Sequence, residues 1–154
     1  MSDRRTKRLQ TEFARLKKQP PKGIKVVHCD NFRRWEVDIQ IIGRHPIYRA
    51  DETFRVRFIF HNDYPISPPE VTFRQTATHR VPIHPHIYSY GVICLNILGK
   101  EGWTAAMTVE SVCLSLQSML ASNREARRPL DDAISRHSSR QPSGIGFYYD
   151  DNRV

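Results

Sequence analysis

Three cysteines are the strongest nucleophiles in this 154-residue sequence, and they stand in different surroundings. Cys94 follows a stretch punctuated by glycine and proline, with His84 and His86 upstream of it. Cys113 lies on the apolar face of a periodic segment, where cysteine usually serves as a small core residue. Cys29 ends a predicted strand and is expected to be structural as well. Cys94 is therefore the candidate for covalent chemistry.

The same region offers two other kinds of site. Thiolate and neutral imidazole are good zinc ligands, and three histidines, His79, His84 and His86, precede Cys94. Zinc sites usually show paired ligands at short spacing, which this sequence lacks, so we predict no metal. A cysteine protease would also combine these residue types, but no protease signature surrounds Cys94. The residues alone leave both alternatives open.

Length, charge and hydropathy limit the class of protein. An apolar fraction of 39% in 154 residues fits one domain with a core, and no apolar run is long enough to span a bilayer. An odd number of widely spaced cysteines without a signal peptide indicates free thiols in the cytoplasm or nucleus. The net charge of +8 calls for an acidic partner, which charge alone does not identify as nucleic acid, anionic membrane or protein.

Hydrophobic periodicity predicts the elements that position Cys94. Asp3 can cap an N-terminal helix that runs to about Lys18, and Pro20 ends it. Alternating apolar and polar residues predict four strands, at 24–28, 35–41, 54–60 and 71–73. Because the connections between them are short, we expect an antiparallel meander in sequence order.

The second half of the chain is predicted to be a loop, a helix and a tail. Residues 74–102 lack periodicity and are expected to form a long functional loop. An amphipathic helix is predicted at 109–120, with Thr108 as its N-cap. The C-terminal end is rich in Ser, Arg, Pro and Gly. We therefore expect a core domain at 1–134 and a flexible tail at 135–154.

Several short strings resemble the ubiquitin-conjugating enzyme family. They are Tyr-Pro-Ile-Ser-Pro-Pro at 64–69, His-Pro-His at 84–86, Gly-Val-Ile-Cys-Leu-Asn-Ile-Leu at 91–98, and Trp103, and Lys-Arg-Leu-Gln-Thr-Glu-Phe at 7–13 extends the likeness toward the N-terminus. The resemblance implies the α+β fold of that family, with an N-terminal helix, a four-stranded antiparallel meander, an active-site loop and a central helix. A short C-terminal tail replaces the usual last two helices.

Within that family the chain is similar to the W type. The likeness rests on His-Pro-His, on Val-Cys-Leu-Ser at 112–115, on Arg-Arg-Pro at 127–129 and on the aromatic and Asp-Asp run at 147–151. This subtype is implied to act on N-terminal amines.

The resemblance implies that Cys94 takes ubiquitin from an activating enzyme as a thioester and passes it to an amine. Thiolate suits this task because it attacks and leaves more readily than an alkoxide. ATP is then consumed by the activating enzyme only, so no cofactor is expected. His86 replaces the family's asparagine near the tetrahedral oxyanion, where it either donates a hydrogen bond or only packs the loop. His84 is implied to organise the loop.

Two departures from the family concern the acceptor amine. Asn96 and Arg128 stand where relatives often have carboxylates, which help lysine to lose its proton. An α-amino group has a pKa of about 7.7 to 8.0, against about 10.4 for lysine, and so needs less help. We therefore expect substrates with flexible N-termini, which reach a cleft flanked by His86, Arg128 and Trp103.

The resemblance also implies partner surfaces. Arg8, on the basic N-terminal helix, matches the face that binds the activating enzyme and ligases, while Ile66, Thr104 and Ala105 match the loops that meet a RING or U-box ligase. Ala105 replaces a proline usual in the family, which makes this loop less rigid. Self-association stays open. The competing functions are a catalytically weak adaptor in ubiquitin transfer and, from charge alone, a nucleic-acid-binding module.

Overall fold

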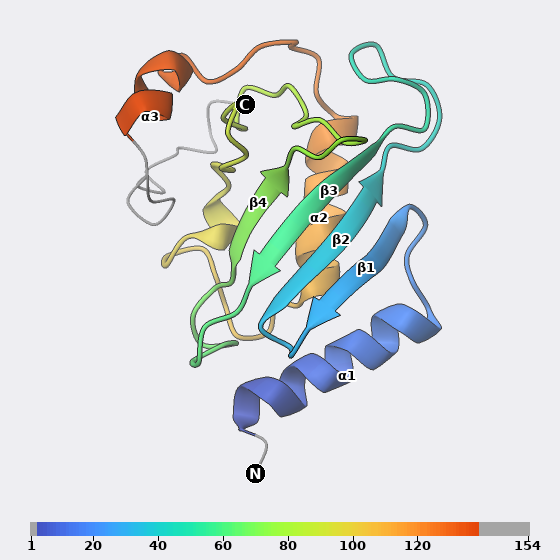
Figure 1. The fold of residues 1–154 in the computed structure, drawn as a ribbon, viewed down its shortest axis with the longest axis vertical. Coiled ribbons are helices and arrows are strands. Elements are labelled where there is room, and N and C mark those ends of the chain that lie inside the picture. Colours follow the sequence, from blue (N-terminus) through green and yellow to red (C-terminus); the bar gives the residue numbers. More distant parts are fainter. Residues whose placement is uncertain (1–2, 139–154) are drawn as a thin grey trace.

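Alternating apolar residues build the central sheet of the protein. The structure, a computed structural model, describes residues 3–138, with side chains as far as residue 135. Its strands are β1 (Ile24–Asp30), β2 (Arg34–Gln40), β3 (Thr53–Ile59) and β4 (Glu70–Arg74). They pair antiparallel in sequence order (Figure 1), which confirms the predicted meander.

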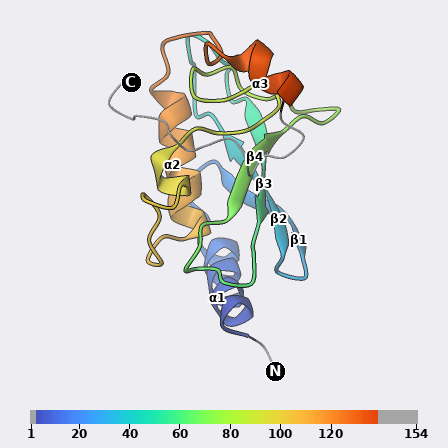
Figure 2. The ribbon, with the colours of Figure 1, turned by 90° about the vertical axis from the view of Figure 1, so that its left-hand side faces the viewer.

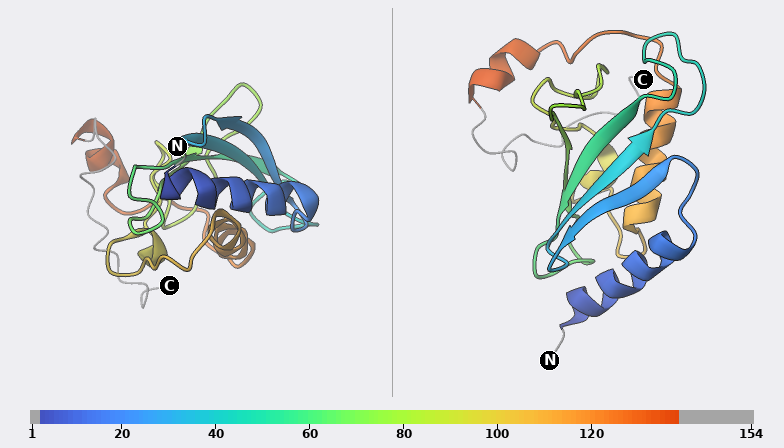
Figure 3. Two further views of the ribbon diagram at one scale, coloured as in Figure 1. Left: turned by 90° about the horizontal axis from the view of Figure 1, so that it is seen from below. Right: turned by 45° about the vertical axis from the view of Figure 1, so that its right-hand side comes forward.

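Two helices cover the apolar side and one end of this sheet. In α1 (Arg4–Lys18), the Asp3 side chain accepts a hydrogen bond from the Thr6 amide at 2.7 Å, so the predicted N-cap is present. The α2 helix (Val109–Ala121) begins with a capping box between Thr108 and Ser111. It lies along one face of the sheet (Figure 2), while α1 crosses below the end of the sheet (Figure 3).

The core lies between the sheet and α2. Trp35, Phe54 and Phe58 point inward from the central strands and are fully buried, and Leu116 and Leu120 of α2 are fully buried against them. The opposite face of the sheet is polar, because the alternate residues of each strand point away from α2. The sheet and α2 therefore form a rigid base for the loops at their ends.

A buried carboxylate ties α1 to the rest of the domain. Glu12 accepts hydrogen bonds from the Tyr64 hydroxyl and from the Val109 amide, both at 2.7 Å, and from Arg8 Nε at 3.1 Å. Buried charges are tolerated when they are paired and hydrogen-bonded in this way. Glu12 thus joins α1, the start of α2 and the loop after β3 at one point.

After α2 the chain differs from the sequence prediction. A short helix, α3 (Asp132–Ser138), follows the segment after α2, and Asp132 stands in its first turn, where a carboxylate favours helix formation. The expected flexible tail at 135–154 therefore overlaps α3 at its beginning, and the remainder of that tail lies outside the described residues. Within the described part of the chain, no helix is long and apolar enough to cross a membrane.

Candidate active site

The loop between β4 and the short helix η1 (Asn96–Leu98) carries Cys94. Its last turn lies against β4, because the Phe73 amide donates to the Gly91 carbonyl at 2.9 Å. Gly91 has a φ of +98°, and a Cβ atom here would lie 2.0 Å from the Phe73 carbonyl oxygen. Only glycine fits this turn. The Cys94 amide in turn donates to the His86 carbonyl at 2.8 Å.

His84 anchors this loop to α2. Its Nδ1 accepts from the His86 amide at 2.9 Å, and a second hydrogen bond joins the imidazole to the backbone of Met119. Burial, reinforced by the neighbouring His86, lowers the pKa of His84 to about 4. At neutral pH, His84 is thus an uncharged link between the loop and the helix.

The low pKa of His84 makes the stability of the fold depend on pH. The unfolded chain binds a proton at this imidazole below pH 6.5, whereas the folded protein binds it only near pH 4. The free energy of unfolding is therefore expected to fall by roughly 3 kcal/mol as the pH drops through this window. Urea denaturation at pH 7.5, 6 and 5 measures the slope, which should be smaller in His84→Asn. An unchanged slope in His84→Asn would contradict the assignment.

Arg128 clamps the beginning of the same loop. Its guanidinium donates to the carbonyl oxygens of Pro82 at 2.6 Å, of Val81 at 3.0 Å and of Ile87 at 3.1 Å. Burial lowers its pKa. Arg128 was predicted to flank the acceptor cleft, and the structure shows that its guanidinium binds the backbone of the loop. Its role in this structure is to hold the loop in shape.

Arg128→Ala is expected to destabilise the protein by about 2–3 kcal/mol, because carbonyls that a charged donor satisfied are left buried without it. Thermal and urea denaturation measure this loss. Arg127→Ala is the matched control, since Arg127 is exposed and its ion pair is with the exposed Glu125; it should cost less than about 0.5 kcal/mol. Equal losses in the two variants would show that the three carbonyl contacts are not important.

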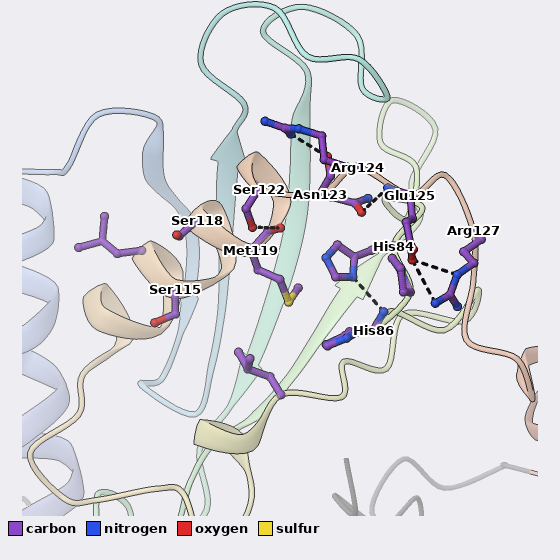
Figure 4. Close-up of a pocket in the computed structure, with 13 residues that line it drawn as sticks. His84, His86, Ser115, Ser118, Met119, Ser122, Asn123, Arg124, Glu125 and Arg127 are labelled. Atoms are coloured by element: carbon purple, nitrogen blue, oxygen red, sulfur yellow. Dashed lines mark hydrogen bonds and ion pairs between the residues drawn. The ribbon is translucent and has the colours of Figure 1, made fainter. Parts of the chain in front are cut away.

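A groove of about 760 Å³ opens beside the loop, between it and α2. Figure 4 shows His84 and His86 on one side of it and side chains of α2, Met119 among them, on the other. Glu125 and Arg127, which form an ion pair at 3.0 Å, stand at its upper rim. Of the two residues predicted to flank the acceptor cleft, His86 lines this groove, opposite α2, and Arg128 does not line it.

Cys94 lies in a small cluster of its own with Tyr88, Val92 and the partly buried Tyr90, and its exposed fraction is 5%. Burial raises the pKa of the Cys94 thiol, and the carboxylate of Asp131 raises it further, while a hydrogen bond with Tyr88 lowers it. The thiol is therefore held mainly in its protonated form.

Tyr88 and Asp131 lie close to Cys94, and neither was predicted from the sequence to belong to the site. The Tyr88 hydroxyl donates to Asp131 Oδ1 at 2.9 Å, and the Ser89 amide donates to Asp132 Oδ1 at 2.7 Å. These contacts place the start of α3 beside the active-site loop, as Figure 1 also shows. The one sequence signal for them is an acidic pair, Asp131 and Asp132, in a region that is otherwise basic.

The other two cysteines are placed as the sequence indicated. Cys113 is fully buried in α2, and burial raises the pKa of its thiol far above the usual range. Cys29 lies in β1 and packs partly buried against the core, which also raises its pKa. The histidines of the zinc alternative do not gather: within residues 3–138, no three potential ligands lie close enough to share a metal ion.

The expected ligase-facing residues meet at one end of the molecule. The Trp103 indole nitrogen donates to the Pro65 carbonyl at 2.8 Å, which ties the loop after β3 to the loop before α2. Ile66 is 68% exposed beside this bond, and Thr104 and Ala105 are exposed in the second loop. Trp103 itself is buried against these loops.

Arg8 and Asn96 complete the predicted residues. Arg8 is half-buried, and its guanidinium contacts Glu12 and the Met107 carbonyl at 3.0 Å, so part of its charge is used inside the protein. Asn96 begins η1 two residues after Cys94, and its side chain is exposed. Asn96 is thus an exposed neutral side chain close to Cys94 in the sequence.

Comparison with known proteins identifies the family of this chain. The family model described as ubiquitin-conjugating enzyme matches residues 8–145. The chain belongs to the ubiquitin-conjugating enzyme family. It is 40% identical, over the full length of both chains, to ubiquitin-conjugating enzyme E2 W of Caenorhabditis elegans and to a probable E2 W of Dictyostelium discoideum. The predicted likeness to the W type is therefore confirmed.

Solved structures agree with this assignment. The E2 enzyme UbcA1 of Agrocybe aegerita superposes with a TM-score of 0.84 at 35% identity, covering 92% of this chain and 99% of UbcA1. Human E2 G1 superposes with a TM-score of 0.66 at 30% identity, over 80% of this chain and 99% of that one. The fold is that of a ubiquitin-conjugating enzyme, and membership implies a transferase that works with ubiquitin, an activating enzyme and a ligase.

Proposed function

We propose that this ubiquitin-conjugating enzyme carries ubiquitin as a thioester on Cys94 and transfers it to N-terminal α-amino groups in preference to lysine. The position of Cys94 supports the first half. Of the three thiols in the sequence, it alone lies outside the helices and the sheet, in a loop braced by His84, Arg128 and Gly91. Such a thiol also needs a reducing compartment, which the cytoplasm or nucleus provides.

The surroundings of Cys94 support the second half. The residue two positions beyond the nucleophile is the neutral Asn96, and Arg128 is a cation bound to the loop. The carboxylate of Asp131 accepts from Tyr88 at one oxygen and from the Ser135 hydroxyl, at 3.2 Å, at the other. Both oxygens of Asp131 thus already accept a hydrogen bond, so this carboxylate attracts a lysine ammonium less than an unpaired one would.

The α-amino group has less need of such help. Its pKa lies about 2.5 units below that of lysine, which corresponds to roughly 3.4 kcal/mol less for deprotonation at neutral pH. The groove beside His86 is lined by Met119 and by Leu95, which directly follows Cys94 in the sequence, and it has room for an extended segment. We infer that substrates with flexible N-termini fit this site, since a chain end can enter where a folded surface cannot.

Charging of Cys94 is tested by incubating the protein with activating enzyme, ATP and ubiquitin. The proposal expects an adduct that forms within minutes and disappears when a thiol reductant is added. An enzyme that binds the same ligases but forms no adduct would instead be an adaptor, which is the second candidate function.

The acceptor preference is tested by discharge of the charged enzyme. A lysine-free peptide with a flexible N-terminus is expected to discharge the thioester at least about tenfold faster than free lysine blocked at its α-amine, both at the same concentration and at pH 7. The same peptide acetylated at its N-terminus is the control and should be inert. Faster discharge onto the lysine side chain would contradict the preference.

A further inference from the structure

The hydroxyl of Tyr88 has one proton and two neighbours that can take it. Asp131 Oδ1 lies 2.9 Å away and receives it in this structure. Cys94 belongs to the same small cluster and lies within hydrogen-bonding reach of the hydroxyl. A phenol donates one hydrogen bond at a time, so Asp131 and a Cys94 thiolate must compete for this proton.

The segment that brings Asp131 here is held mainly by polar contacts. Asp132 accepts from the Ser89 amide at 2.7 Å, next to the Tyr88–Asp131 bond, while the preceding Leu130 is 97% exposed. A segment held by a few hydrogen bonds and little apolar packing can open and close without unfolding the core. Figure 2 shows α3 at the edge of the molecule, away from the sheet and α2.

We propose that Asp131 is a positioning residue: it takes the hydrogen bond of the Tyr88 hydroxyl while the enzyme carries no ubiquitin, and its release lets Tyr88 donate to the Cys94 thiolate. The inference rests on the proposed role of Cys94 as the nucleophile. While the Tyr88 hydroxyl donates to Asp131, a Cys94 thiolate receives no hydrogen bond from Tyr88 and lies near the Asp131 carboxylate. When Asp131 leaves, the thiol proton passes to water and Tyr88 stabilises the sulfur anion that attacks.

The contributions of four other groups on or beside this loop must be separated from this effect. On the loop, Tyr90 packs against the cluster and the His86 carbonyl accepts from the Cys94 amide. Arg128 binds the Ile87 carbonyl, and Asp132 binds the Ser89 amide. Asp132 is the useful comparison, because it has the same charge as its neighbour Asp131 and does not bond to Tyr88.

The experiment measures how fast Cys94 reacts with iodoacetamide between pH 6 and 10, with the modified peptide quantified by mass spectrometry. Asp131→Asn is expected to react about 3- to 10-fold faster than wild type at pH 7.5, with the midpoint of the pH profile shifted down. Asp132→Asn should stay within about twofold of wild type. In a Tyr88→Phe background, Asp131→Asn should give less than about a twofold gain, because the donor that it releases is absent.

Two outcomes would overturn the proposal. One is an unchanged alkylation rate of Cys94 in Asp131→Asn. The other is an equal gain in rate from Asp131→Asn in the wild-type and Tyr88→Phe backgrounds, which would mean that the charge of Asp131, or its shielding of the thiol from solvent, acts without Tyr88. A neutral amide oxygen accepts a weaker hydrogen bond than a carboxylate, so Asp131→Asn loosens the hold on Tyr88 while it keeps the shape of the side chain. Melting curves of the Asn variants verify the fold. Alkylation needs neither ubiquitin nor activating enzyme, so failure here is distinct from failure of the charging assay.

Discussion

Cys94→Ser is expected to convert the thiol-labile ubiquitin adduct into one that survives reductant, and to slow its discharge onto amines by at least about a thousandfold. Serine places an oxygen where the sulfur stood, and the loop geometry, set by the Cys94 amide bond to His86, does not change. An alkoxide is a poorer leaving group than a thiolate, so the ester accumulates once formed. Cys94→Ala removes the acceptor and should give no adduct.

Cys29 provides the matched control for this prediction. Cys29 is the most exposed of the three thiols. Cys29→Ala should still form a reductant-sensitive adduct at the wild-type rate. Gel electrophoresis of samples treated with or without reductant distinguishes the three variants. A labile adduct in Cys94→Ser would place the thioester on another cysteine and remove the basis of the proposed mechanism.

Gly91→Ala is expected to have the largest effect among changes that leave every functional side chain in place. Its methyl group would lie 2.0 Å from the Phe73 carbonyl oxygen, in backbone with a φ of +98°, so the turn must move off β4. The Phe73–Gly91 hydrogen bond would then be lost. We expect a loss of at least about 3 kcal/mol in the free energy of unfolding, and charging slowed about tenfold because Cys94 follows this turn.

Gly43→Ala separates backbone strain from the clash at Gly91. Gly43 also has a positive φ, +79°, but no atom lies within 4 Å of the position that its Cβ would take. The variant should cost about 1 kcal/mol and leave charging unchanged. Urea denaturation and the charging assay compare the pair. Similar losses at both positions would mean that contact with Phe73 does not hold the loop.

The regular elements could be predicted because local sequence governs them. The alternation around Trp35 and Phe58 gives each strand one buried face, and Thr108 and Asp3 cap their helices through bonds three residues away. The α3 helix was not predicted. It has no apolar stripe, and its first turn is held by partners at 88 and 89, which lie far away in the sequence.

The candidate site divides in the same way. The residue type, the surrounding motif and the position outside any periodic segment were sufficient to select Cys94 as the candidate nucleophile and to set Cys113 in the core. The sequence also placed Ile66 among the exposed residues that a partner would meet. These are properties that a residue and its near neighbours decide.

Only the tertiary structure decided what surrounds that nucleophile. Arg128 was expected beside the acceptor but binds three carbonyls of the loop, and Asp131, which had drawn no attention, reaches Tyr88 beside Cys94. The physical reason is that a charged side chain takes whichever hydrogen-bonding partner the path of the chain brings within about 3 Å. For Arg128 and Asp131 those partners lie more than forty residues away in sequence, where no local pattern announces them.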